Sequence, residues 1–146
     1  DVNFGDTKEG SFGMRIAGTM KVDAKLGGKI TNAEGLNDKQ AWGKKSSWVN
    51  YTGPVDGRPA GITIHDHPSS FQHPCRWHVR TYGLFAANPF GIHDFEKKPE
   101  GTGDYRVPAG GSVRFRYRFL FHHGDSVSAD VAGHFRSYAK ESHEEK

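Results

Sequence analysis

The sequence predicts an all-β fold, an antiparallel β-sandwich or jelly roll in a single domain (residues 1–146) with one C-terminal helix. Three observations predict it. Apolar and polar residues alternate with a period of two in several short runs. The 19 glycines and 7 prolines place turn signals between these runs. Only after Gly124 does the apolar period become that of a helix.

The first half of the chain contains several short runs typical of strands. The predicted strands are Ser11–Ala17, Met20–Ala24, Ser47–Tyr51 and Gly61–His65. Lys29–Thr31 is expected to pair back with Met20–Ala24 across the turn at Gly27 and Gly28. Residues 32–47 have no clean period and are predicted to form a loop with one helical turn. Turn residues at 53–54 and 56–57 are expected to end the strand that begins at Ser47.

The second half has the clearest alternation. Its predicted strands are Arg76–Tyr82, Leu84–Ala87, Tyr105–Val107 and Ser112–His123, with a polar loop over residues 92–104. The last strand is the strongest prediction, because every second residue is apolar. The core-facing set is Val113, Phe115, Tyr117, Phe119 and Phe121, opposite Arg114, Arg116 and Arg118. That arginine face is either solvated or covered by another layer.

A helix is predicted after Gly124. Val127, Val131, Phe135 and Tyr138 recur at helical spacing, with Ser126 or Ser128 as the cap and an end near Glu141. The tail over residues 142–146 is expected to fray.

Composition excludes some classes of protein. The net charge of +3 comes without a Lys/Arg block or a recognition helix, so no nucleic-acid partner is expected. No apolar run reaches the roughly 18 to 20 residues of a membrane span. One cysteine, Cys75, excludes an internal disulfide and leaves the compartment open. The chain begins without Met, which favours a mature form or a fragment.

The histidines of Gly61–Phe90 could bind a metal. His65 and His67 are two residues apart, so in a strand both imidazoles face the same side. His78 or His73 could supply a third nitrogen for Zn, Cu, Fe or Mn, in an arrangement that faintly resembles a cupin motif. The alternatives are an acid/base role or two partly exposed histidines at a strand end.

A second candidate is the cationic face of the next strand. Arg76, His78 and Arg80 share it, and a titratable imidazole among guanidinium groups suits an anionic or polyhydroxyl ligand. The alternative is a solvated sheet face. The neighbouring charges of Lys8 and Glu9 could serve as acid/base apparatus or belong to an ordinary polar loop. Tryptophans could stack on sugar rings or build the core.

Several long strings resemble, in order, a bacterial family of unknown function that has been labelled methane oxygenase PmoA. They include FGDTKEGSFGMR, AWGKKSSWVNYTGP, DHPSSFQHPCRWHVRTYGLFAANPFG and PAGGSVRFRYRFLFHHGD. The label predicts no activity here, since such a monooxygenase subunit is an integral membrane protein. The matched positions are Lys8, Glu9, Arg15, Asp66, His67, Trp77, His78, Arg80, Asn88 and Phe90.

The resemblance implies a periplasmic or secreted protein connected with carbohydrate metabolism and built like the galactose-mutarotase supersandwich. It also implies that this chain corresponds to the C-terminal half of longer proteins, so a site shared between halves would be incomplete. His65 stands where the family pattern has an apolar residue, which creates the His-x-His pair and favours a metal site specific to this chain.

The leading hypothesis is a domain that binds or acts on a carbohydrate. His67, His78 and Glu9 would be the acid/base groups, and Arg15, Arg80, Trp77, Asn88 and Lys8 would hold the sugar. One alternative is a cupin-like metalloenzyme, such as an oxidative polysaccharide-cleaving enzyme, that uses His65, His67 and His78. The other is a non-catalytic module that associates with itself or with a missing partner half.

Overall fold

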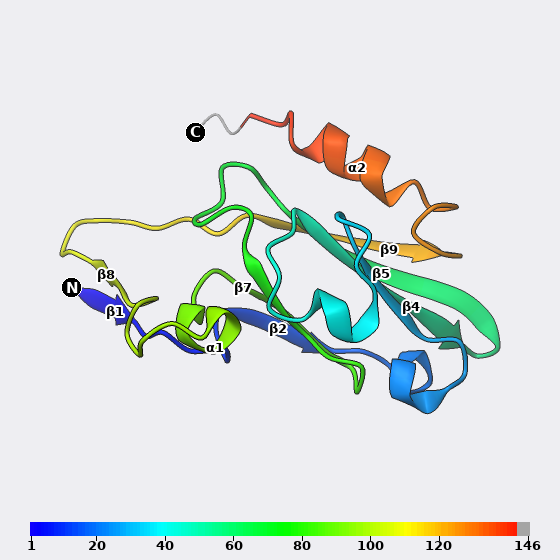
Figure 1. Ribbon diagram of the computed structural model, residues 1–146. Coiled ribbons are helices and arrows are strands. Elements are labelled where there is room, and N and C mark those ends of the chain that lie inside the picture. The colour runs from blue at the N-terminus through cyan, green and yellow to red at the C-terminus, as the bar shows by residue number, and fades with distance from the viewer. Residues whose placement is uncertain (143–146) are drawn as a thin grey trace.

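The computed structural model describes residues 1–142 and confirms the predicted all-β sandwich. Two antiparallel sheets pack face to face, a two-stranded sheet lies at one end, and helix α2 covers the outside of the larger sheet (Figure 1). None of the helices within this range is long and apolar enough to cross a membrane. The fraying predicted for the tail concerns residues that fall almost entirely outside the described range.

The larger sheet has the strand order β3-β4-β5-β9, with β3 at Lys29–Asn32, β4 at Trp48–Val55, β5 at Arg58–Asp66 and β9 at Tyr117–His123. Strands β4 and β5 form a hairpin whose turn residues, Asp56 and Gly57, both have positive φ angles of 49° and 73°. Two-residue turns of this kind match the twist of paired strands. The expectation that residues 53–54 end the strand is wrong, because they stay paired with β5 up to that turn.

The smaller sheet has the order β2-β7-β6, with β2 at Phe12–Arg15, β7 at Leu84–Asn88 and β6 at Arg76–Val79. A short sheet of β1 (Val2–Phe4) and β8 (Tyr105–Val107) lies at its end. Phe4 ties this short sheet to the sandwich by stacking on Phe90, with ring centroids 4.9 Å apart. Phe71 and Phe115 complete the aromatic cluster there.

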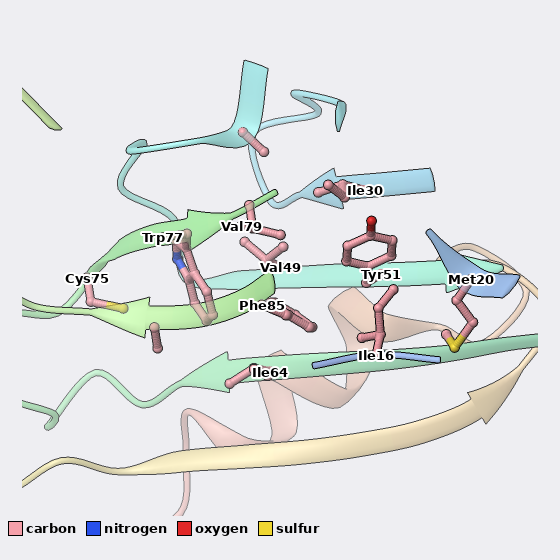
Figure 2. Close-up of a cluster of buried hydrophobic side chains, with 12 residues drawn as sticks. Ile16, Met20, Ile30, Val49, Tyr51, Ile64, Cys75, Trp77, Val79 and Phe85 are labelled. Atoms are coloured by element: carbon pink, nitrogen blue, oxygen red, sulfur yellow. The ribbon is translucent and has the colours of Figure 1, made fainter. Parts of the chain in front are cut away.

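The core fills the space between the two sheets, as Figure 2 shows. Trp77 and Phe85 from the smaller sheet face Val49, Tyr51 and Ile64 from the larger one, and all five are 0% exposed. The polar atoms of the two largest side chains are satisfied. The Tyr51 hydroxyl lies 3.0 Å from the Thr81 carbonyl, and the Trp77 Nε1–H donates to the Ser46 carbonyl at 2.8 Å. The core therefore combines apolar burial with paired polar groups.

The strand predicted at Met20–Ala24 is wrong. Two 3₁₀ turns, η1 (Gly18–Met20) and η2 (Val22–Ala24), occupy this segment, and β3 pairs with β4 instead. The backbone of Met20 lies directly on Gly53, where an added Cβ would come within 2.4 Å of the Met20 Cα. Residues 18–24 thus pack across the face of the larger sheet, against the backbone of β4, instead of adding a strand to the edge of that sheet.

The long strand predicted at Ser112–His123 is half right. Strand β9 begins only at Tyr117, because the preceding residues bond to the loop after β5: His67 N–H donates to the Arg116 carbonyl and Phe71 N–H to that of Arg114. Phe121, expected in the core, is 68% exposed. The opposite face is partly covered, since Arg116 is buried beside helix α2 while Arg114 is exposed.

Three further helical segments complete the described structure. The predicted turn in the 32–47 loop is η3 (Asp38–Ala41), whereas α1 (Ile92–Glu96) was not expected within the polar loop. The C-terminal helix α2 is Val131–Tyr138, shorter than predicted. Its cap is Asp130, whose carboxylate accepts the Gly133 N–H, and not either predicted serine.

We predict that Gly53→Ala destabilises the protein by roughly 2 to 3 kcal/mol. The new methyl group would meet backbone atoms of Met20, which can move away only by shifting η1. Gly18→Ala is the matched control, since nothing lies within 4 Å of its added Cβ. Chemical denaturation of both variants measures the effect, and equal stability of the two would contradict the close packing of η1 on β4.

Candidate functional site

The candidate site lies on the outer face of the smaller sheet, around His78. Strand β6 alternates, so Trp77 and Val79 point into the core while Arg76 and His78 point outward. In the sheet, His78 pairs with Ala86 of β7, and Ala86 pairs with Gly13 of β2. These two small residues leave the sheet surface beside the imidazole unfilled.

A loop closes this hollow from above. Residues 8–11 pass over the sheet and enclose a cavity of about 90 Å³. Its lining includes Lys8, Glu9, Gly10, Gly13, His78 and Ala86. Three of the predicted site residues, Lys8, Glu9 and His78, therefore come together although Lys8 and His78 are 70 positions apart in the chain.

The hydrogen bonds of His78 fix its tautomer. Its Nδ1–H donates to the Lys8 carbonyl at 2.9 Å, so Nε2 carries the lone pair, and the Arg80 Nε–H donates toward it at 3.3 Å. Burial lowers the pKa of His78, while the Lys8 carbonyl and the nearby Glu9 carboxylate partly oppose this shift. The imidazole is therefore neutral at pH 7 and presents a basic nitrogen.

Asn88 holds the loop in place instead of reaching a ligand. It is 0% exposed, and its Nδ2–H donates to the Thr7 carbonyl at 2.8 Å while its Oδ1 accepts the Phe90 N–H at 2.8 Å. The Lys8 backbone and side chain both contact the Asp94 carboxylate of α1. Both residues were predicted to bind substrate, and the structure places them as supports for the loop over His78.

Arg80 lies beside His78 on a partly exposed indole. Its guanidinium carbon is 4.7 Å from the centre of the Trp42 ring, a cation–π geometry. The Trp42 ring in turn meets the edges of His78 and Phe95. The residues of this site are thus packed against each other before any ligand arrives.

The remaining predicted sugar-binding residues lie elsewhere. Trp77 is fully buried in the core, so it packs and does not stack on a ligand. Arg15 is exposed at the end of β2, with its guanidinium 5.5 Å from the Tyr82 ring centre. Tyr82 borders a second cavity beside Arg80, which places Arg15 at the margin of the site.

His65 and His67 face the opposite side of the molecule, beneath α2. Both rings contact Tyr138 of that helix, and His65 also meets Phe135. Burial lowers the pKa of His65 to about 4, and the neighbouring His134 and Arg118 add to the shift. Burial also lowers the pKa of His67, whose Nδ1 accepts hydrogen bonds from Ser69 N–H and the Arg116 guanidinium.

The structure does not assemble the predicted metal site. His65 and His67 do share a face, as their spacing predicts, but His78 belongs to the other sheet. Across residues 1–142, no three His, Cys, Asp or Glu side chains are gathered to hold a metal. His67 is also separated from His78, so the two predicted acid/base histidines do not act on one ligand.

The assembled groups suit proton transfer and polar recognition. His78 and Glu9 line the same small cavity, and the Arg80 guanidinium contacts the imidazole of His78. Sequence reasoning missed two contributors to this site: the small floor residues Gly13 and Ala86, and Trp42 as the support of Arg80. Gly13 and Ala86 come to lie beside His78 through strand pairing, and Trp42 reaches Arg80 from a long loop. Neither arrangement produces a local sequence pattern.

Comparison with known proteins adds a family but no activity. A family model described as a family of unknown function (DUF6807) matches residues 1–136, which fits the expectation of a family of unknown function. No curated protein matches the chain. No solved structure matches it.

The buried His65 predicts a pH dependence of stability. Its folded pKa of about 4 lies below the usual 6.5, so the unfolded chain binds the proton first and stability falls as the pH drops from 6.5 toward 4. This single group accounts for roughly 2 to 3 kcal/mol. Denaturation at pH 7.5 and 4.5 should show a clearly smaller loss in His65→Gln than in the wild type.

His123→Gln is the control, because His123 is exposed. It should keep the wild-type dependence on pH. His67 and His78 also have lowered pKa values, so the dependence in His65→Gln should be reduced without vanishing. If His65→Gln lost as much stability as the wild type, docking of α2 would not require a neutral His65.

Proposed function

We propose that this chain, which belongs to the family of unknown function DUF6807, binds a carbohydrate at the His78 cavity and uses His78 as a base toward a sugar hydroxyl. The observation that carries the proposal is the state of the imidazole. Its Nδ1–H is occupied by the Lys8 carbonyl, so Nε2 carries the lone pair; this nitrogen accepts the Arg80 Nε–H at the long distance of 3.3 Å, a bond that a sugar hydroxyl would replace. An imidazole held in one tautomer and neutral at pH 7 is able to accept a proton as a general base.

The surrounding groups match a polyhydroxyl ligand. Sugar hydroxyls both donate and accept hydrogen bonds, and the site offers the His78 acceptor, the Glu9 carboxylate and the Arg80 donors. Tyr82, which is 44% exposed, and the partly exposed Trp42 provide apolar surface for the carbon faces of a sugar.

The size of the cavity limits what enters it. Small-molecule sites usually measure about 300 to 1,000 Å³, whereas this cavity is about 90 Å³ and a neighbouring one about 170 Å³. The cavity therefore takes one polar edge of a sugar, while the rest of the ring lies over Arg80, Trp42 and Tyr82. Glu9 is exposed on the closing loop, where it can accept or return the proton as the second acid/base group.

We predict that His78→Gln lowers the affinity for the bound sugar about tenfold. It should also lower any turnover of that sugar by a factor of roughly 10² or more, because the base is lost while the fold remains. Calorimetric titration with a panel of neutral and acidic saccharides measures binding, and a chromatographic assay of the same mixtures measures turnover. His123→Gln, remote from the cavity lining, is the control and should behave as wild type.

The pH dependence separates a base from a passive hydrogen-bond acceptor. Turnover should fall when Nε2 becomes protonated. Because the pKa of His78 is lowered, the midpoint of this fall should lie below the ordinary histidine pKa of about 6.5. Saturable binding without turnover would limit the proposal to a binding module. Failure of every saccharide to bind, or equal binding by His78→Gln and wild type, would refute it.

A further inference from the structure

A second cavity next to the His78 site is lined by cations. It measures about 170 Å³, and its walls come from Lys39, Trp42, Val79, Arg80, Thr81 and Tyr82. Arg80 also contacts His78, which lines the first cavity, so a direct side-chain contact connects the linings of the two cavities. No carboxylate is among the residues that line it.

Arg80 differs from the other cations of the same face. Arg76, on strand β6, which ends just before Arg80, pairs with Glu96 of α1, and Lys8 pairs with Asp94. Arg80 makes no ion pair with any carboxylate in residues 1–142; its contacts are the Trp42 ring and the His78 nitrogen. The charge of Arg76 is therefore paired with a carboxylate, whereas that of Arg80 is not paired with any carboxylate of residues 1–142.

The contacts of Arg80 leave its guanidinium group able to bind a carboxylate through two hydrogen bonds. Its Nε–H is directed to His78, and stacking on Trp42 holds the plane of the group, while the four terminal N–H donors have no partner within residues 1–142. A planar guanidinium with two adjacent donors binds a carboxylate in bidentate fashion. Lys39, an exposed residue that also lines this cavity, adds a second positive charge.

We propose that the ligand of this site is an acidic saccharide, with a uronate carboxylate bound by Arg80 and Lys39. This inference rests on the proposed function, because the same ring then presents a hydroxyl to His78. One sugar residue can reach both groups, because the Arg80 side chain contacts the His78 ring directly through its Nε–H at 3.3 Å. A neutral sugar would leave the guanidinium beside it without an anion.

The test compares glucuronate and galacturonate oligosaccharides with the matching neutral gluco- and galacto-oligosaccharides by calorimetric titration. Wild type should bind the acidic series at least tenfold more tightly, with a preference that weakens as salt is raised. Arg80→Gln should remove this preference, so that the variant binds the acidic and the neutral series with similar affinity. Arg58→Gln, an exposed arginine at the start of β5, is the matched control and should retain it.

Each outcome decides between the two proposals. Equal affinity for acidic and neutral sugars in wild type would overturn the uronate inference while the carbohydrate proposal stands. The uronate inference also fails if Arg80→Gln, shown to be folded by its thermal melting curve, keeps the acidic preference. If neither series binds, the carbohydrate proposal fails and the uronate inference with it. Arg80→Lys should recover only part of the preference, since an ammonium keeps the charge and loses the bidentate geometry.

Discussion

The burial of Trp77 between the two sheets is the constraint on which the candidate site depends. The indole is fully buried, its Nε1–H is bonded to the Ser46 carbonyl, and its own carbonyl accepts the Gly43 N–H at 2.8 Å. Strand β6 cannot rotate without exposing this large apolar group. Because side chains alternate along a strand, fixing Trp77 inward fixes His78 outward. Packing in the core thus sets the outward orientation of His78, the proposed base.

The same alternation explains how much of the fold could be predicted. Each strand of the two main sheets overlaps a segment that the sequence predicts to be a strand, and the C-terminal helix lies within a period-3.6 run. Errors came where long-range contact overrides local pattern. Met20–Ala24 packs on the Gly53 backbone, and the first half of the Ser112–His123 run bonds to a loop. Helix α1 has only five residues between Gly91 and Lys97, too few for a period to show.

Part of the candidate site could also be predicted from the alternation of side chains along a strand. Residues on one strand, such as His78 and its neighbours, follow from spacing, and the resemblance to a known family added Lys8 and Glu9. The sequence could not separate contact with a ligand from support of the site. Trp77 and Asn88 hold structure, and His65 and His67 lie under α2, because sheet pairing and layer order decide which face each residue meets.

The stacking of Arg80 on Trp42 also bears on the entropy of recognition. A free arginine side chain carries about 2 kcal/mol of rotamer entropy, which is lost when a ligand immobilises it. Here the indole and the His78 nitrogen already restrict the guanidinium, so that loss occurs during folding and not on association. Trp42 therefore contributes to affinity through the order it imposes on its neighbour, independently of any surface it offers to a ligand.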